Sequence, residues 1–284
     1  MIKFHIPDFY FLNQLNRTLI DLINESPNLF YDNISIGSIY GTFSNAIWNG
    51  GRISTGRYIS RNNILNTIEE FNKRNVPLRY TFTNSQVTDI HFNDEYCNEI
   101  LKLSNNGFNE IMVNNLALEE YLRKNYPNFK YILSTTAAIR GIDNINKACE
   151  KYDMIVIDYN DNRDIELLDK IENKDKIEIL INETCPPNCQ FRKYHYDLIS
   201  QIQINPDLDK DRTGFQCPND KSDLTNINEE ELYGIYSEMG FSNFKIRGRM
   251  NPPKLVTEYY VKYLVKPEYK DNVREMLWYS VCLF

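Results

Sequence analysis

Two hydrophobic periodicities alternate along this chain from one end to the other. Short apolar runs, such as residues 2–6 and 34–40, are typical of buried strands. Between these runs lie segments with apolar residues at helical spacing; the first, residues 9–24, carries Leu12, Leu15 and Leu19. The pattern predicts six further strands, at 78–83, 110–113, 130–134, 154–158, 177–181 and 243–246. It predicts further helices at 61–74, 94–105, 116–125, 142–150, 163–172, 229–239, 253–265 and 268–278, and one that ends near Ile199.

Eight strands that alternate with helices predict an α/β fold, a parallel (β/α)8 barrel of the TIM type. A doubly wound open sheet is the alternative, because the same alternation also builds that fold. Residues 203–228 are polar and rich in Asp and Asn, which predicts an insertion between strands seven and eight. We expect the barrel domain to span residues 1–266 and a helical tail, residues 267–284, to pack on it.

Composition narrows the function classes without choosing one. The chain has 42% hydrophobic and 25% charged residues, which is ordinary for a globular protein. A net charge of -7 without a stripe of Lys and Arg argues against tight nucleic-acid binding. No apolar run approaches the roughly 18 residues of a membrane span, and Pro7 interrupts any secretory signal. We therefore expect a cytoplasmic protein with reduced thiols. Its aromatic residues either fill the core or form an interface with a partner protein or a second copy of the chain.

A loop with two thiols follows the seventh predicted strand. Cys185 and Cys189 are separated by Pro186, Pro187 and one further residue. Proline is tolerated in the first turn of a helix, so the loop predicts a helix start with Cys185 at the cap and Cys189 one turn later. Thiolates near a helix N-terminus are suited to a metal or a cluster, and Cys217 is the third candidate ligand.

Other interpretations of the cysteines remain open. Buried cysteine often only packs, and this is the expectation for Cys97 and Cys282. His195, after the thiol loop, adds an imidazole, and thiolates with imidazole suit zinc.

Polar side chains follow nearly every predicted strand. In a barrel, chemistry collects at the C-terminal ends of the strands, which form one rim. The candidates for binding a substrate there are Asn84, Asn114, Asp158, Arg247 and Arg249. A guanidinium fork matches a carboxylate or phosphate, so we expect a small anionic substrate. The alternative is that strand ends are polar because loops are, and that Arg249 only forms a salt bridge to Glu183.

Glu183 and His195 are the candidate catalytic residues of this rim. A carboxylate in a cleft can exchange a proton with a substrate. No Gly-x-Ser-x-Gly elbow and no nucleophile–base pair is recognisable, so peptidase activity is not expected. Trp48, in the glycine-rich segment 41–52, either covers a ligand or packs in a turn.

One segment carries a resemblance to a known family. Residues 240–250, Gly-Phe-Ser-Asn-Phe-Lys-Ile-Arg-Gly-Arg-Met, resemble the Gly-x-x-x-Phe-Lys-Ile-x-Gly-Arg signature of the collagenase-like peptidase family. Residues 107–115 and 131–136 resemble the ends of that family's fourth and fifth strands. The likeness covers most of residues 1–266 and implies a barrel. Some members are classed as proteases; others are iron–sulfur proteins that hydroxylate RNA bases or ubiquinone precursors without oxygen.

The resemblance implies a cluster at the thiol loop. Iron–sulfur members place two ligands where Cys185 and Cys189 stand and a later one near Cys217. Those members use four cysteines, whereas only three can be placed here; Glu183, His195 or a substrate atom is left as the fourth ligand. The first functional hypothesis is therefore an iron–sulfur (4Fe-4S) enzyme with redox or hydroxylation chemistry on a small anionic substrate. A zinc-containing barrel with a binding or structural role is the second, and a binding barrel without turnover the third.

Overall fold

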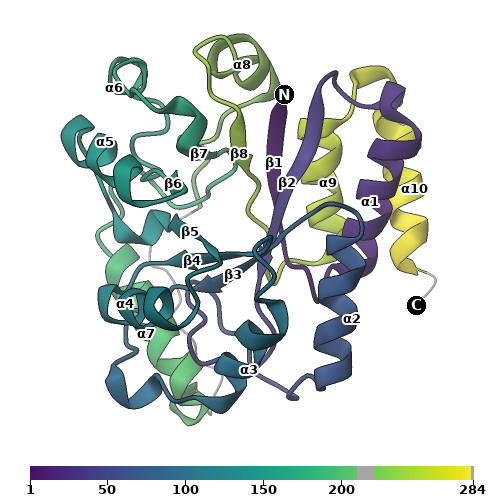
Figure 1. Ribbon diagram of the computed structural model, residues 1–284. Helices are drawn as coiled ribbons and strands as arrows, with labels where there is room; N and C mark the ends of the chain where they lie inside the picture. Colours follow the sequence, from purple (N-terminus) through teal and green to yellow (C-terminus); the bar gives the residue numbers. More distant parts are fainter. Residues whose placement is uncertain (210–220, 283–284) are drawn as a thin grey trace.

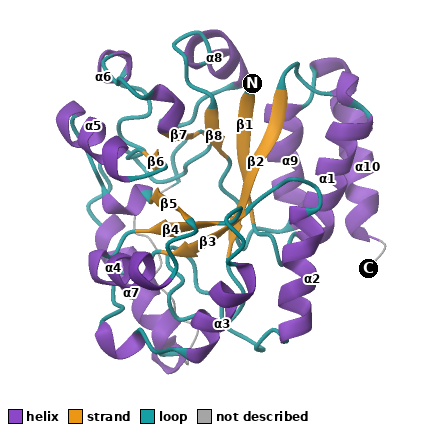
Figure 2. Ribbon diagram, viewed as in Figure 1, coloured by secondary structure: helices purple, strands orange, loops and turns teal. Residues whose placement is uncertain are grey.

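The computed structural model describes residues 1–209 and 221–282 and contains one closed barrel of eight parallel strands (Figures 1 and 2). The strands are β1 (Ile2–Pro7), β2 (Ile34–Gly41), β3 (Leu78–Phe82), β4 (Glu110–Val113), β5 (Lys130–Leu133), β6 (Met154–Val156), β7 (Ile177–Leu180) and β8 (Asn243–Lys245). Each strand pairs with its neighbours in sequence, and β8 pairs with β1 in parallel. That last pairing closes the sheet, so the predicted (β/α)8 barrel is confirmed and the open sheet is excluded.

Helices surround the barrel (Figure 2). Their bounds are α1 (Asn13–Glu25), α2 (Arg61–Asn72), α3 (Glu95–Ser104), α4 (Leu116–Asn125), α5 (Ile142–Lys151), α6 (Ile165–Asp169), α7 (Arg192–Ile204), α8 (Glu229–Glu231), α9 (Pro253–Leu264) and α10 (Lys270–Cys282). Several begin at the expected cap: the side chains of Ser60, Asp94 and Asn115 each accept a hydrogen bond from the third residue of the helix. The helix predicted at 229–239 is divided, because a π-helical turn, Leu232–Tyr236, follows α8.

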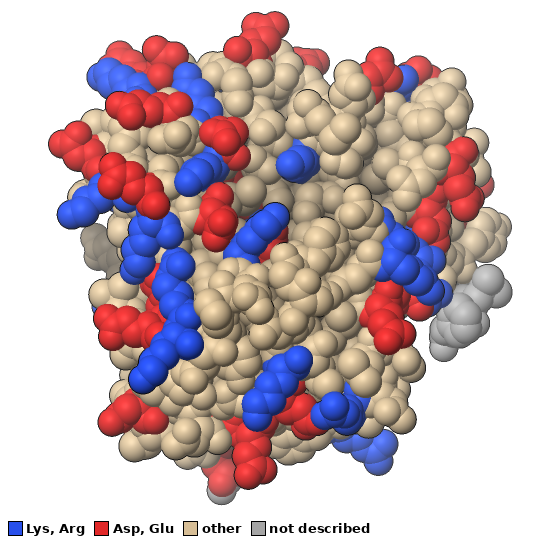
Figure 3. Space-filling view, viewed as in Figure 1, with Lys and Arg blue, Asp and Glu red and all other residues tan. Residues whose placement is uncertain are grey.

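The first helix of the chain and its last two helices lie on one side of the barrel. Helix α10, which lies in the segment predicted as a tail, contacts α1 and α9 (Figure 1). The polar insertion predicted at 203–228 falls partly on residues 210–220, outside the described ranges. Within those ranges, no helix combines the length and the apolar character needed to cross a membrane. Acidic and basic residues are interspersed over the face shown in Figure 3.

The two faces of the strands have opposite character. Side chains that alternate outward, such as Phe4, Ile6 and Phe244, are fully buried in the apolar layer beneath the helices. Several inward-facing positions hold ionisable groups where branched apolar layers are usual in this fold. The inner apolar cluster consists of Met112, Ile132 and Val156, with Met154 packed against it. The axis of the barrel is therefore mainly polar.

Candidate functional site

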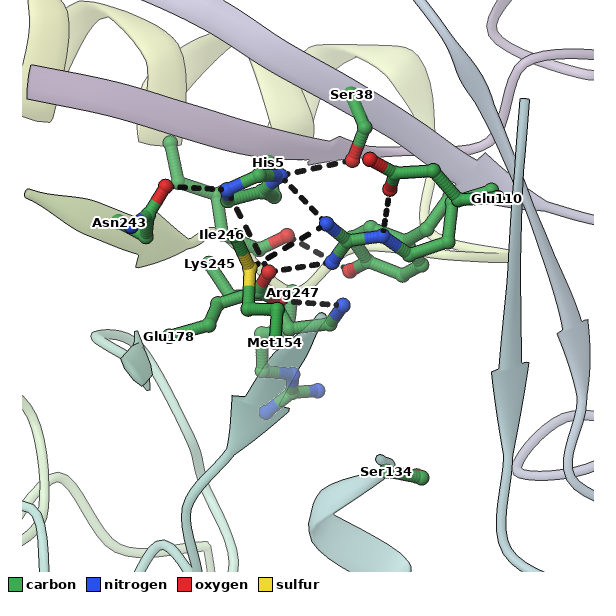
Figure 4. Close-up of polar contacts among 12 residues, drawn as sticks. His5, Ser38, Glu110, Ser134, Met154, Glu178, Asn243, Lys245, Ile246 and Arg247 are labelled. Carbon is green, nitrogen blue, oxygen red and sulfur yellow. Dashed lines mark hydrogen bonds and ion pairs between the residues drawn. The ribbon is translucent and has the colours of Figure 1, made fainter. Parts of the chain in front are cut away.

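An ionic network fills the barrel axis; we call it the axial network, and its members are His5, Arg79, Glu110, Glu178 and Lys245 (Figure 4). Arg79, fully buried on β3, donates from Nε to Glu110 Oε2 at 2.6 Å and from Nη1 to Glu178 Oε2. Lys245 Nζ donates to Glu178 Oε1 at 3.0 Å. Two cations thus face two carboxylates, so the charges balance when His5 is neutral. Burial would raise the pKa of Glu178, but Arg79, His5 and Lys245 together hold it well below its usual range.

The hydrogen bonds of His5 assign its tautomer. Its Nδ1 accepts from Arg79 Nη2 at 3.0 Å, and Ser38 Oγ lies 2.8 Å from the same nitrogen. Nε2 therefore carries the proton and donates to Asn243 Oδ1 at 3.3 Å. Burial lowers the pKa of His5 to about 3, with Arg79 and Lys245 adding to the effect and Glu178 opposing it. His5 is a neutral member of the network at physiological pH.

Lys245 lies where the axial network meets the C-terminal end of the barrel. Its Nζ is 3.6 Å from the centroid of the Tyr40 ring, and the Tyr40 hydroxyl donates to the carbonyl of Ile246 at 2.7 Å. Burial lowers the pKa of Lys245 to about 8, although the nearby Glu178 carboxylate raises it. The ammonium thus loses its proton more readily than that of an ordinary lysine.

A cavity of about 80 Å³, the mouth cavity, lies at the C-terminal ends of the strands above Lys245. A space of this size can hold a few water molecules or a small ligand. Its described lining consists of Tyr40, Gly51, Arg52, Thr81, Thr83, Met112, Ser134, Thr135, Thr136, Val156, Leu180, Glu183, Tyr196, Lys245, Arg247, Gly248 and Arg249. A larger cavity, about 880 Å³, opens at the other end of the barrel, where chemistry is not expected in this fold.

Positive charge dominates the described lining of the mouth cavity. Arg52, Arg247 and Arg249 contribute three cations besides Lys245, which Glu178 balances, and Glu183 is the one carboxylate among the described lining residues. An excess of cations in a concave site attracts an anion, because low-dielectric walls concentrate the field.

Glu183 is held as a carboxylate by neighbours on three sides. Its Oε2 lies 3.2 Å from Arg192 Nη1, and its Oε1 lies 3.7 Å from Arg247 Nη1. Oε1 also accepts from the backbone N–H of Thr184 at 2.8 Å. Burial would raise the pKa of Glu183, but Arg192 and Arg247 lower it below the usual range. The expected alternative, an Arg249–Glu183 salt bridge, is wrong, since other arginines hold this carboxylate.

Arg249 is a half-buried cation held by neutral groups. Its Nη1 donates to Asn49 Oδ1 at 2.9 Å and to Thr81 Oγ1 at 2.6 Å, and its Nη2 donates to the Gly50 carbonyl at 2.8 Å. Asp8 lies near enough to influence it, but no carboxylate of the described residues forms an ion pair with it. Burial and the charge of Arg52 lower the pKa of Arg249 to about 10. The site around it favours an added negative charge.

Arg247 has a donor left over. Its Nη1 donates to Thr184 Oγ1, while its Nε is buried and has no hydrogen-bond acceptor in the described parts of the chain. Thr135 also lines the mouth cavity, and its hydroxyl oxygen is likewise buried without a hydrogen-bond partner in the described parts of the chain. Buried polar groups without partners are costly, so these atoms mark where a polar ligand would be stabilised.

The sequence-predicted residues divide into two groups. Glu183, Arg247 and Arg249 line the mouth cavity together. Asn84 instead ties the loop after β2 to α7, donating to the carbonyls of Ile47 at 2.8 Å and Ser200 at 3.0 Å. Asp158 is buried and accepts from the backbone of Asn160 at 2.9 Å. Asn114 lines a separate surface groove next to Leu116.

His195 lies on α7, near the rim but outside the described lining of the mouth cavity. Its ring stacks on that of Tyr196 with centroids 5.8 Å apart. Burial lowers its pKa, and the charges of Arg52 and Arg192 act in the same direction.

Sequence reasoning missed Arg52 and the inward-facing Arg79 and Glu178. The signal for Arg52 was present in the Gly50-Gly51-Arg52 sequence after the second strand. Arg79 and Glu178 are each a single charged residue within a mainly apolar run. The same pattern is typical of a strand whose charged side chain faces solvent, so it does not predict an inward position.

The thiol loop does not begin a helix. Helix α7 starts at Arg192, and Asn188, with φ of 53°, turns the chain out of any helical path after the two prolines. The predicted cap role of Cys185 is therefore wrong. The loop is tied to the loop after β6 instead, because Asn188 N donates to Asn160 Oδ1 at 2.7 Å and Cys189 N donates to Tyr159 Oη at 3.2 Å.

The described cysteines give an incomplete metal site. Cys185 and Cys189 are both partly exposed, and burial raises the pKa of the Cys185 thiol although Arg192 opposes it. In residues 1–209 and 221–282 no group of three or more His, Cys, Asp or Glu side chains is arranged to hold a metal ion. Cys217 lies outside these ranges. The described residues alone do not complete a cluster or a zinc site.

Two further expectations concern packing. Cys97 is fully buried on α3, as predicted for a packing residue, whereas the side chain of Cys282 is not among those described. Trp48 is also fully buried, and its Nε1 donates to the carbonyl of His91 at 2.9 Å. The indole therefore packs in the loop after β2 and does not cover a ligand.

Comparison with known proteins identifies the fold. No protein-family model matches the chain, and no curated protein sequence matches it. Among solved structures, the chain is similar to the U32 peptidase Mk0906, with a TM-score of 0.56 and 13% sequence identity. The similarity covers 87% of this chain and 92% of that one. It supports the resemblance to the collagenase-like peptidases at the level of the barrel fold.

Proposed function

We propose that the mouth cavity is the active site of an enzyme that acts on a small anionic molecule, a carboxylate or a phosphate. The observation that carries the proposal is the unbalanced charge of the described lining: Glu178 balances Lys245, but Arg52, Arg247 and Arg249 meet one carboxylate. Glu183 forms its ion pairs with Arg192 and Arg247, so its single charge cannot balance Arg52 and Arg249 as well. An anionic ligand would supply the missing counter-charge.

Arg249 and Arg247 would contribute to ligand binding in different ways. Arg249 has committed both terminal nitrogens to protein acceptors and would act on a ligand mainly through its charge. Arg247 keeps its buried Nε for a directed hydrogen bond. Glu183, as a carboxylate, would accept a proton from the substrate.

The binding test uses calorimetric titration of the full chain with phosphate, acetate and lactate. We expect Arg247→Lys to lose at least tenfold in affinity, because an ammonium lacks the Nε donor and the planar fork. Arg140→Lys is the matched control: Arg140 pairs with Asp161 at 2.6 Å, is half exposed and lies outside the described lining of the mouth cavity. The proposal fails if the wild-type protein binds none of these anions, or if the two variants bind them equally well.

We also propose that Cys185, Cys189 and Cys217 hold a metal centre near this site, a 4Fe-4S cluster with redox or hydroxylation chemistry or, as the alternative, zinc. The partly exposed position of the first two thiols supports the proposal. Protein purified without oxygen would be analysed for iron, sulfide and zinc and by visible absorption. Alanine at each of the three positions should remove the metal, whereas Cys282→Ala should retain it. Metal-free wild-type protein would refute the proposal, and full occupancy in Cys217→Ala would exclude that ligand.

A further inference from the structure

Lys245 combines three features that belong together in a nucleophilic amine. It is nearly buried at the base of the mouth cavity, its Nζ lies 3.0 Å from Glu178 Oε1, and the Tyr40 ring covers another side of the ammonium. Arg247 follows two residues later and lines the same cavity. Arg247 lies just beyond the end of β8, close enough in the chain for its long side chain to reach a small ligand next to Lys245.

We propose that Lys245 forms an imine with small 2-oxo acids bound in the mouth cavity. The inference rests on the proposed anion site, because the carboxylate of the oxo acid would be held by Arg247 and the charges of Arg52 and Arg249. The carbonyl carbon, next to that carboxylate, would then face the amine at the base of the cavity. The volume of the cavity suits a small oxo acid.

The reaction needs no oxidant or other reagent. The neutral amine adds its lone pair to the carbonyl carbon, a C–N bond forms, and the carbonyl π bond breaks to give a carbinolamine after proton transfer from nitrogen to oxygen. The hydroxyl group then leaves as water with one added proton, and the nitrogen lone pair forms the C=N bond. In sum, a lysine ammonium and a ketone give a protonated imine and water.

The axial network suits the charge of the product. A protonated imine carries the same single positive charge as the ammonium it replaces. The balance of Lys245 and Arg79 against Glu110 and Glu178 is therefore preserved, and Glu178 remains the counter-ion. The unpartnered hydroxyl of Thr135 is available in the same cavity to the carbinolamine oxygen.

The protonation state of Lys245 supports the same role. With its pKa lowered to about 8, roughly a tenth of the amine is neutral at pH 7, against less than a thousandth for an ordinary lysine. The competing interpretation is that Lys245 serves only as the counter-ion of Glu178. A counter-ion has no reason to react with a carbonyl compound, so trapping chemistry separates the two roles.

The test is reduction by sodium borohydride of the full chain incubated with pyruvate or glyoxylate, followed by mass spectrometry of the intact protein and its peptides. We expect one reduced adduct on the peptide that contains Lys245, formed more slowly when phosphate or lactate is added. Lys245→Arg should reduce labelling at least tenfold. Lys176→Arg is the control, since Lys176 Nζ is engaged by the carbonyl of Cys149 at 2.8 Å outside the described cavity lining.

The outcomes separate this inference from the function on which it rests. No adduct, or labelling spread over surface lysines, in a protein that still binds phosphate or lactate would overturn the imine and leave the anion site standing. A protein that binds no anion would overturn both. If Lys245→Arg does not fold, the labelled position in the wild-type peptides decides the question alone.

Discussion

At the scale of single residues, the unusual feature is a set of opposite charges removed from water along the barrel axis. Removing one partner of a buried pair leaves the other uncompensated, which costs about 3–5 kcal/mol. We therefore expect Glu178→Gln, which leaves Arg79 and Lys245 in excess, to lower the free energy of unfolding by that amount. Denaturant unfolding followed by circular dichroism measures the loss.

A surface pair provides the comparison for that prediction. Arg163 and Glu231 form an ion pair in which the arginine is 43% exposed. Glu231→Gln should cost about 1 kcal/mol or less, because water screens and replaces the interaction. Equal costs for the two substitutions would show that the axial network is hydrated and not buried.

His5 makes stability depend on pH in a defined window. The folded protein keeps His5 neutral down to about pH 3, whereas an unfolded histidine binds a proton below about pH 6.5. The unfolded state therefore holds more protons in this window, and stability should fall as pH falls, by up to about 1.4 kcal/mol per pH unit. His5→Gln should flatten the dependence between pH 6.5 and 5, measured as unfolding free energy.

His91→Gln is made in parallel, because His91 lies in the 3-10 turn before α3 and outside the axial network. An unchanged slope in His5→Gln would assign the pH dependence to other groups.

At the scale of elements, the loop after β2 is fixed by a close approach between backbones. Gly50 N donates to the carbonyl of Thr81 at 3.1 Å, and a Cβ added at Gly50 would lie 2.3 Å from the Thr83 carbonyl oxygen. Gly50→Ala should therefore cost about 1–3 kcal/mol through overpacking and should weaken anion binding, since the Gly50 carbonyl holds Arg249. Thermal unfolding and the phosphate titration measure the two effects.

Gly234→Ala is the matched control, because a Cβ at Gly234 meets nothing within 4 Å. We expect it to be neutral or slightly stabilising. Equal destabilisation by both substitutions would contradict the close approach at Gly50.

Elements could be predicted from the sequence more fully than the site. The bounds of β4 and α4 agree with prediction to the residue, because helical and strand periodicities are local properties. The inward position of Glu178 could not be predicted in this way, since a charge within an apolar run usually marks the exposed face. The contact between Arg249 and Gly50 joins residues that are far apart in the chain, so no local pattern encodes it.

The thiol loop shows the same limit on a shorter scale. Two prolines after Cys185 are typical of a helix start, and they are equally compatible with the turn that Asn188 makes. Local sequence preferences are compatible with a helix start and with a turn. The turn that forms is accompanied by contacts with Tyr159 and Asn160 from a neighbouring loop.

At the scale of the whole molecule, charge argues against a nucleic-acid partner. The net charge is -7, and basic residues are interspersed with acidic ones on the face shown in Figure 3. Tight binding would require clustered cations that displace counterions from phosphates. We expect no submicromolar complex with duplex or single-stranded nucleic acid at physiological salt in a filter-binding assay. A complex whose affinity falls steeply between 50 and 200 mM salt would contradict this.

The polar axis of the barrel also shapes how the protein responds to heat. Exposing apolar surface on unfolding raises the heat capacity, whereas exposing polar surface lowers it. A barrel that hides Arg79, Glu178 and Lys245 along its axis should therefore show a smaller heat-capacity change than one filled with hydrocarbon layers. The free energy of unfolding should therefore vary less steeply with temperature. Because the hydration of ions weakens on warming, the axial charges also become less costly to bury as temperature rises.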